Sequence, residues 1–237
     1  MPTTFAYVVQ HDLNTARQQN GAYSGIRKFK RYGVADKEGG AGFPWRTTLD
    51  PRTPFTRVPG TNRGFDAATP QFDQLRYVDE KAAITLATGL EARLINAEAA
   101  LRRSDTTGFM GLLNGLRAVP PSYILAGVQG TSVPNDQPRP VAPLAALANP
   151  TDSTAAIDLL FAERARWLWG TAHRLNDLRR LERALGVRGG FGRPDSTLFP
   201  HGVYFKNGLT YGTDVNFPVP LDEQNNPNFT QCLDRLP

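Results

Sequence analysis

The sequence predicts a mainly α-helical fold with extensive irregular loops and short strands. Two segments, 88–118 and 153–185, carry apolar residues at steps of three and four, which is the spacing that places side chains on one face of a helix. Turn-forming residues dominate much of the remaining chain, with 22 glycines and 19 prolines in 237 residues. This share, about 17% against a typical ~12%, favours long loops over a compact helical bundle.

Composition excludes several classes of protein. Apolar residues make up 40% and charged residues 21% of the chain, so it is neither an acidic tail nor a disordered polar segment. A single cysteine, Cys232, excludes an internal disulfide framework and a cysteine-based zinc cluster. The histidines His11, His173 and His201 lack metal-binding spacing. We therefore expect no metal and no cofactor.

The sequence shows no sign of a membrane span. No apolar run approaches the ~20 residues that a transmembrane helix needs. The first ten residues lack the basic start, the apolar core and the small-residue cleavage site of a signal peptide. Read alone, these features predict an unexported chain, but a truncated piece of a longer exported protein would have the same pattern.

Residues 1–75 are predicted to form an irregular region that serves as a possible ligand surface. One short strand is expected over residues 5–9, where aromatic and β-branched residues gather. Trp45, Tyr23 and Tyr32 lie in this region, and flat aromatic faces on loops suit stacking on sugar rings. We predict these three as ligand-binding residues. The alternative, that Trp45 only anchors its loop against the core, stays open.

Residues 88–118 are predicted to form an antiparallel helix pair. Thr88 and Glu91 have the spacing of a capping box at its start. A break at Ser104 is followed by Asp105, which suits the cap of the second helix. The apolar positions expected in the shared core are Leu90, Leu94, Ala97, Leu101, Phe109, Leu112, Leu113 and Leu116.

A connection over residues 119–152 leads to one long helix predicted over 153–185. Asp152 or Ser153 suits its N-cap, and Gly186 suits a left-handed stop. We expect Trp169 to pack in the core and Trp167 to cover a loop. The apolar stripe that should face the helix pair is Ile157, Phe161, Ala165, Leu168, Ala172, Leu175 and Leu178.

The tail, residues 186–237, is predicted to contain loops and a hairpin. The segment 204–211 contains an Asn-Gly pair at 207–208. Asn-Gly is typical of a two-residue hairpin turn.

Three ordered segments resemble one known family. The residues ERARWL at 163–168 and HRLNDLRR at 173–180 are similar to the ERxxEL…GHRxxDLRR signature of SusD/RagB-type outer-membrane nutrient-binding proteins. Upstream, 91–117 resembles that family's helix pair, and near the end FPVP and NPN, within 217–228, resemble its closing PIP…NPN segment. The resemblance covers about residues 77–232. It departs from the signature at Trp167, Thr171 and Ala172.

This resemblance implies a fold and a function. The fold would be SusD-like: a helical hairpin of tetratricopeptide type plus a long C-terminal helix. The protein would be the nutrient-binding component of an outer-membrane glycan uptake system, facing outward, capturing a glycan or another small nutrient and passing it to a SusC-like TonB-dependent transporter. Family members are about twice as long and begin with an export signal, a lipidated cysteine and helical repeats, so this chain resembles their C-terminal half. The signature residues would be structural rather than catalytic: Glu163, Arg164, Arg166, His173, Arg174, Asp177 and Arg180.

A cytosolic nucleic-acid-binding or scaffold protein is the alternative. The formal net charge of +5 permits contact with phosphates. The arginine-rich stretch 164–193 is interrupted by Asp177 and Glu182, so it does not form an all-basic face. We therefore do not expect nucleic acid as a partner.

A hydrolase is the third possibility. His173 and Asp177 stand one helical turn apart, and Asp222 with Glu223 forms an acidic doublet of the kind a glycosidase uses. No nucleophile or third orienting group stands at a recognisable spacing from His173 and Asp177, and Asp222 with Glu223 is typical of a solvated turn. We expect no catalytic residue and no enzyme.

Overall fold

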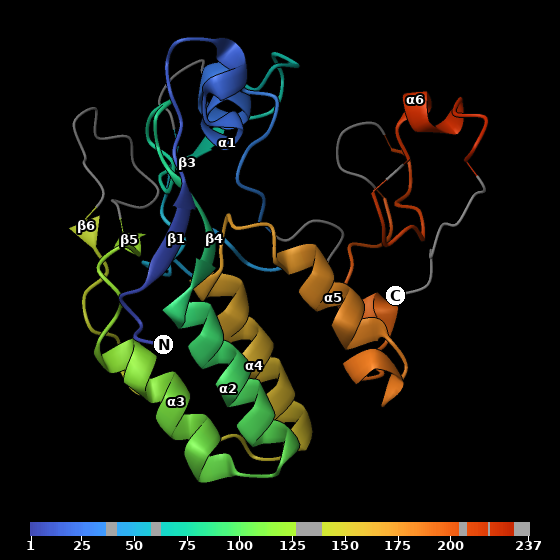
Figure 1. Ribbon diagram of the computed structural model, residues 1–237. Helices are drawn as coiled ribbons and strands as arrows, with labels where there is room; N and C mark the ends of the chain where they lie inside the picture. The colour runs from blue at the N-terminus through green and yellow to red at the C-terminus, as the bar shows by residue number, and fades with distance from the viewer. Residues whose placement is uncertain (37–41, 58–62, 127–138, 204–207, 218, 230–237) are drawn as a thin grey trace. The chain divides into compact units, whose positions relative to one another are not determined.

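The computed structural model describes residues 1–36, 42–57, 63–126, 139–203, 208–217 and 219–229 (Figure 1). The fold is α/β, with 36% helix and 10% strand. The described residues divide into two compact units, one formed by Met1–Ala35 with Trp45–Ala172 and one by Asp36–Pro44 with His173–Pro237. We treat each unit by itself.

The predicted mainly α-helical, SusD-like fold is therefore wrong. Six helices are accompanied by strands that pair two by two into small antiparallel sheets within the described ranges. The prediction relied on helical periodicity, which is strong over ten or more residues. Strands of two to five residues carry no comparable periodic signal, and they acquire partners only from distant segments.

The first sheet joins the start of the chain to the helix pair. Strand β1, Ala6–Val9, pairs antiparallel with β4, Ile84–Thr88, so that Ala6 lies opposite Thr88. The strand predicted over 5–9 is thus confirmed. Because β4 runs directly into the first long helix, this pairing anchors the N-terminal segment to the core (Figure 1).

The second sheet and a short helical segment lie in the same unit. Strand β2, Phe55–Arg57, pairs antiparallel with β3, Phe72–Gln74. The phenyl rings of Phe55 and Phe72 meet edge to face, with centroids 6.2 Å apart. The remaining elements of this region are the short helix α1, Gly21–Tyr23, the π-turn η2, Ser24–Lys28, the turn η1, Ala16–Gln18, and the strand pair β5, Leu125–Ala126, with β6, Arg139–Pro140.

The helix pair forms as predicted. Helix α2, Gly89–Arg102, is capped by Thr88, whose hydroxyl accepts from the Glu91 amide at 2.9 Å. Helix α3, Thr106–Ala118, is capped by Asp105, which accepts from the Gly108 amide at 2.8 Å. The predicted core positions Leu90, Leu94, Ala97, Phe109, Leu113 and Leu116 are buried, while Leu101 and Leu112 are half-buried.

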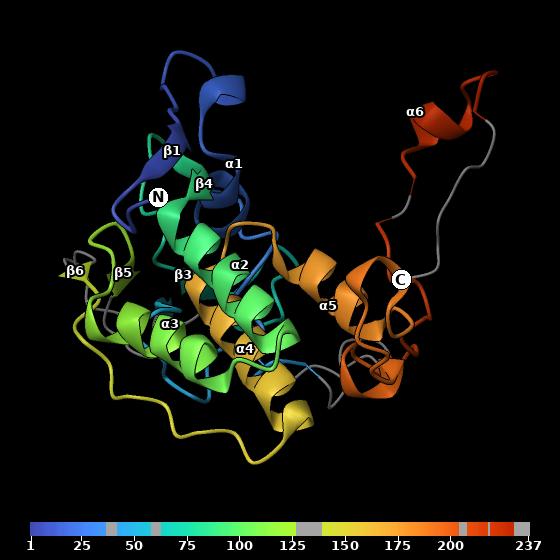
Figure 2. The same cartoon turned by 60° about the horizontal axis from the view of Figure 1, so that its bottom comes forward.

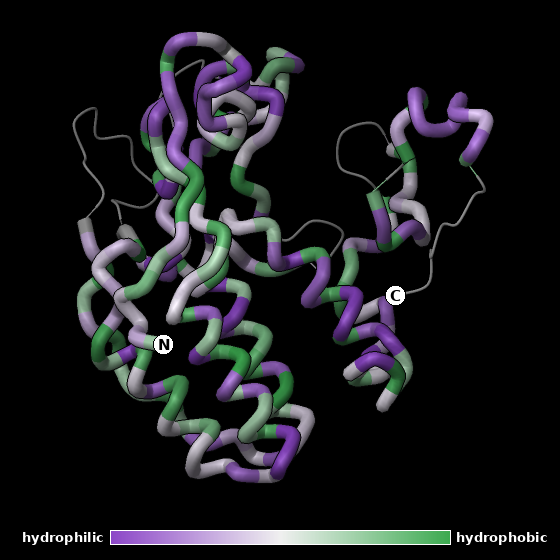
Figure 3. The backbone as a smooth tube through the Cα atoms, in the orientation of Figure 1, coloured by the Kyte–Doolittle hydropathy of each residue, from purple (hydrophilic) through white to green (hydrophobic). Residues whose placement is uncertain are grey.

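Helix α4, Ser153–Trp167, lies against α2 (Figures 1 and 2), and Figure 1 shows α2 between α3 and α4. Its predicted cap is confirmed, because the Asp152 carboxylate accepts from the Ala155 amide at 2.8 Å. Hydrophobic and hydrophilic residues alternate along the three helices, as expected when one face of each is buried (Figure 3).

The single long helix predicted over 153–185 is wrong. Helix α4 ends at Trp167, and α5 covers only Arg174–Glu182. Between them Gly170 and Ala172 have φ of +71° and +63°, in the left-handed region that interrupts a right-handed helix. The apolar steps of three and four continue across this break, so periodicity alone did not reveal it. Ala172 and Leu175 therefore do not extend the stripe of α4.

The second unit contains α5 and short turns. The chain after α5 folds back on it, because the amides of Phe191 and Arg193 donate to the carbonyls of Arg180 and Leu181 at 3.2 and 2.8 Å. Gly186 has φ of +82°, as its predicted role as a stop requires, although α5 ends earlier, at Glu182. The other elements are η3, Val187–Gly189, η4, Asp195–Thr197, and α6, Leu221–Gln224.

The predicted hairpin lies partly outside the described residues, which exclude 204–207. Val203 and Thr210, on either side, form an antiparallel bridge. Cys232 also lies outside the described part. Among the helices that are described, none is long and apolar enough to cross a membrane.

Candidate functional site

The first candidate is a buried cluster of charges around Glu163 of α4. Glu163 and Arg52 are each 1% exposed. The Arg52 guanidinium donates to both carboxylate oxygens of Glu163, at 2.7 and 3.1 Å, and that of Arg117 donates to Oε1 at 2.9 Å. The indole N–H of Trp167 donates to Oε2 at 3.0 Å. Glu163 therefore links a distant loop and α3 to α4.

Asp50 completes this cluster. Its carboxylate accepts from Arg52 Nε and Nη2 at 2.9 and 2.7 Å and lies 3.1 Å from Arg166 Nε. Burial alone would raise the pKa of Asp50, but the hydrogen bonds and positive charge of Arg52 outweigh it and leave that pKa below its ordinary value. Arg52, Asp50 and Glu163 thus satisfy one another, which is the arrangement of a scaffold rather than of a ligand site.

The signature predicted from the sequence is divided between the two units. Glu163, Arg164 and Arg166 lie on α4 of the first unit, whereas His173 and the residues after it begin the second. The buried Arg164 guanidinium lies 6.0 Å from the ring of Phe161.

In the second unit, the signature residues surround Arg174. Its guanidinium lies 5.0 Å from the Phe43 ring, and burial lowers the Arg174 pKa to about 10, partly opposed by the charge of Asp177. The buried Asp177 carboxylate lies 3.4 Å from Arg180 Nη1. These contacts tie α5 to the segment before Trp45 and involve no reactive group.

The candidate catalytic pairs do not form a recognisable centre. His173 and Asp177 are joined through the backbone, where the Asp177 amide donates to the His173 carbonyl at 3.0 Å. Asp222 and Glu223 are exposed on the short helix α6. Within the described ranges, no three histidine, cysteine or acidic side chains gather as metal ligands would.

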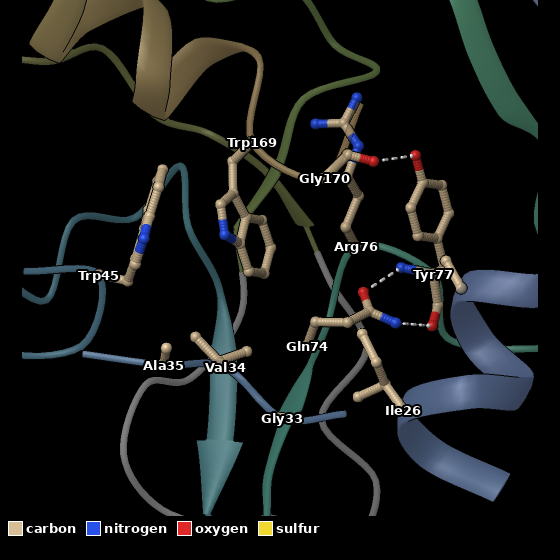
Figure 4. Close-up of a pocket in the computed structure, with 11 residues that line it drawn as sticks. Ile26, Gly33, Val34, Ala35, Trp45, Gln74, Arg76, Tyr77, Trp169 and Gly170 are labelled. Atoms are coloured by element: carbon tan, nitrogen blue, oxygen red, sulfur yellow. Dashed lines mark hydrogen bonds between the residues drawn. The ribbon is translucent and has the colours of Figure 1, made fainter. Parts of the chain in front are cut away.

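The second candidate is a pocket of about 280 Å³ in the first unit (Figure 4). Its walls include the indoles of Trp45 and Trp169 and the apolar side chains of Ile26 and Val34. Both indoles are half-buried, so part of each remains open to a ligand. Figure 4 shows the two indoles on one side of the pocket, with Arg76 and Tyr77 beyond Trp169. The pocket thus combines aromatic and polar walls.

Tyr77 is held in place from two directions. The Gln74 side chain, at the end of β3, accepts from the Tyr77 amide and donates to its carbonyl, both at 2.7 Å. The Tyr77 hydroxyl donates to the Gly170 carbonyl at 2.9 Å. The strand β3 and the break after α4 therefore meet at this pocket, and the break is part of its wall.

Arg76 is the charged side chain of the pocket wall. A Cβ on Gly170 would lie 3.1 Å from Arg76 Cδ, so the Arg76 stem passes closely over the bare glycine backbone. The guanidinium carbon lies 5.8 Å from the Tyr77 ring centre, a weak cation–π contact. No carboxylate among the described residues pairs with Arg76.

The structure places the three predicted ligand residues differently. Trp45 lines the pocket, and the Thr53 hydroxyl donates to its carbonyl at 3.4 Å. Tyr23 and Tyr32 are not in the described pocket wall, although their neighbours Ala22 and Gly33 are. Tyr32 is 69% exposed, and the Tyr23 ring lies 5.9 Å from the Arg27 guanidinium.

Sequence reasoning reversed the roles of the other two tryptophans. Trp167 is fully buried and Trp169 lines the pocket, whereas the expectation was the opposite. The error follows from the helix assumed to continue past Trp169. A signal was present, because a glycine such as Gly170 costs about 1 kcal/mol relative to alanine inside a helix. Arg76 and Tyr77 carried no sequence signal of their own.

No family model, curated protein or solved structure matches this chain. The SusD/RagB resemblance therefore remains a prediction from the sequence motifs.

Proposed function

We propose that the protein binds a small saccharide in the pocket between Trp45, Trp169 and Arg76. The observation that carries this proposal is the pair of half-buried indoles in one cavity with polar groups beside them. Sugar rings present apolar C–H faces to aromatic rings and hydroxyls to polar side chains. Such a wall is typical of small-molecule sites, which are mainly apolar with a few placed polar groups.

The size of the pocket limits what enters it. Its volume of about 280 Å³ is close to the lower end of the ~300–1,000 Å³ range of ligand pockets. This space suits one end of a saccharide rather than a long internal stretch. With few stacking contacts, we expect a Kd of roughly 0.1–1 mM, or about 4–5.5 kcal/mol.

We further propose that binding serves nutrient uptake at the outer face of an outer membrane. The support is the sequence resemblance to SusD/RagB-type proteins over three ordered segments. The partner would be a SusC-like TonB-dependent transporter, to which the ligand is passed without chemical change. Co-purification of the protein with such a transporter from its native membrane tests this part, and consistent failure to co-purify would contradict it.

The saccharide proposal is tested by calorimetric titration of a panel of oligosaccharides. Trp45→Ala and Trp169→Ala should each weaken binding by about 2- to 12-fold, the value of one aromatic contact. Tyr32→Ala is the matched control, because it removes an exposed aromatic ring outside the described pocket wall, and it should change Kd by less than twofold. Binding that persists unchanged in both tryptophan variants would place the site elsewhere, and absence of any saccharide binding would reject the proposal.

A further inference from the structure

The positive charge of Arg76 in the pocket wall indicates which class of saccharide the pocket binds. We propose that the bound saccharide carries an anionic group, a carboxylate or a sulfate, and that Arg76 holds it. This inference rests on the proposed saccharide binding and adds the chemical class of the ligand. It is carried by the surroundings of Arg76, the positive side chain in a wall that contains no acidic residue among its described members.

Arg76 differs from other arginines of its unit because it has no carboxylate partner among the described residues. The Arg52 and Arg117 guanidiniums in the same unit contact Glu163 at 2.7 and 2.9 Å. Arg76 is half-buried and its stem lies against Gly170, while its guanidinium has a weak contact with the Tyr77 ring and no carboxylate partner among the described residues. A cation next to apolar walls is poorly hydrated, so an incoming anion gains more there than on an open surface.

The side chain of Arg76 is held in place by its neighbours before any ligand binds. The Arg76 stem lies against the backbone of Gly170, and its neighbour Tyr77 is bonded to both Gln74 and Gly170. Gly170 has φ of +71°, which an alanine adopts only with strain, so the close passage of the stem depends on this glycine. A restrained arginine loses less freedom on binding and matches the paired oxygens of a carboxylate or sulfate with its fork of N–H groups.

The aromatic residues Trp45 and Trp169 share one cavity with the positively charged Arg76. Trp45, Trp169 and Arg76 line one cavity of about 280 Å³. A single acidic sugar unit presents a flat C–H face and a carboxylate at its edge. It therefore meets an aromatic wall and a cation in the same small space, whereas a free inorganic anion would leave the indoles unused.

The test compares matched charged and neutral probes. Tri-galacturonate and its methyl ester share one sugar backbone, and the ester replaces each negative charge with a small neutral methyl ester. The wild-type protein should bind the acid about tenfold more tightly than the ester at 50 mM salt. This preference should shrink at 500 mM salt, because salt screens the interaction of charges.

Arg76→Met should remove the preference while leaving the Kd of the ester within twofold. Arg93→Met is the matched control, because Arg93 is exposed on α2 and outside the described pocket wall. Arg76→Lys keeps the charge and should retain part of the preference, and circular dichroism of all three variants checks that they fold. Equal binding of acid and ester, with no change in Arg76→Met, would overturn the anion inference while saccharide binding stands.

A second pair of probes tests the anion site independently of saccharide binding. 2-Naphthoate and 2-naphthamide present a flat aromatic ring with and without a negative charge. If no saccharide binds but the naphthoate binds more tightly in an Arg76-dependent way, the anion site stands and the saccharide proposal falls. If none of the four probes binds, the anion inference is rejected, and the saccharide proposal is rejected with it only when no oligosaccharide of the panel binds either.

Discussion

Two arginines in the same unit show how a scaffold differs from a binding site. Arg52 is 1% exposed and contacts the carboxylates of Asp50 and Glu163, both at 2.7 Å. Arg76 is half-buried beside a cavity, and its guanidinium has a weak contact with the Tyr77 ring and no carboxylate partner among the described residues. A buried charge is tolerated when it is paired. The pairing of Arg52 therefore marks a structural link, and the unpaired charge of Arg76 marks a place for an anion.

The largest effect is expected from Glu163→Gln. The change keeps the shape of the side chain but removes the charge that three groups contact. Breaking a buried ion pair costs about 3–5 kcal/mol, because the partner charge stays buried. Urea unfolding should show this loss in the free energy of unfolding.

Asp158→Asn is the control for that prediction. Asp158 is exposed on the same helix and also carries a carboxylate. Its replacement should change stability by no more than about 0.5 kcal/mol. Similar losses in the two variants would show that the cluster around Glu163 does not stabilise the fold.

A smaller effect is expected from pH. The pKa of Asp50 is lowered in the folded state, so its contribution to stability is complete above the ordinary aspartate pKa of about 3.9 and is lost as the pH falls through the folded value. The stability difference between wild type and Asp50→Asn should therefore shrink on acidification from pH 5 to pH 3.

Asp73, in the same unit, is expected to have the opposite effect of pH on stability. Burial raises the pKa of Asp73, only partly offset by a hydrogen bond from Gln71 and the charge of Arg27. Its charge therefore costs stability at neutral pH, and the cost disappears as the pH falls through the raised pKa. Wild type should gain stability relative to Asp73→Asn on acidification. Urea unfolding at a series of pH values measures both differences, and equal slopes would contradict the assignment.

Gly170→Ala should cost about 1–2 kcal/mol. The φ of +71° is strained for alanine, and the added Cβ would lie 3.1 Å from Arg76 Cδ. Gly111→Ala is the matched control, because Gly111 lies in α3 with nothing within 4 Å of an added Cβ. That change should stabilise the protein by about 0.5–1 kcal/mol. Thermal unfolding of both variants checks the contrast in sign.

The smallest effect on stability is expected from Arg76→Met. Arg76 has no ion pair to lose among the described residues, and methionine keeps an apolar stem against Gly170. The free energy of unfolding should change by no more than about 0.5 kcal/mol. The same substitution at Arg52 should cost far more, because it leaves carboxylates buried without their cation. Equal losses at the two positions would remove the distinction between them.

Local patterns in the sequence predicted the elements that depend on nearby residues. The capping side chains of Thr88, Asp105 and Asp152 bond amides three residues away, so their roles follow from sequence spacing. The break between Trp167 and Arg174 does not follow in this way. At this break the Tyr77 hydroxyl donates to the Gly170 carbonyl from 93 positions away in the chain.

The candidate site could be predicted only in part. Trp45 was predicted because flat aromatic faces on loops suit stacking on sugar rings, and it lines the pocket, but Tyr23 and Tyr32 lie outside the described pocket wall. Trp169 was misplaced because a helix was assumed to continue through Gly170. Arg76 resembles any other arginine in the sequence, and its lack of a carboxylate is visible only when its neighbours are placed.

The sequence by itself determined the helix pair, the caps of three helices and the first strand, because each depends on residues within about one helical turn or on a short apolar pattern. Only the tertiary structure decided which charges are paired and which indole is open. Those properties depend on contacts such as Arg52 with Glu163, which are 111 positions apart in the chain. Spacing along the chain contains no information about which distant segment supplies a counter-charge to a given arginine. The presence of that counter-charge at Arg52, and its absence at Arg76 among the described residues, distinguishes the buried charge cluster from the pocket.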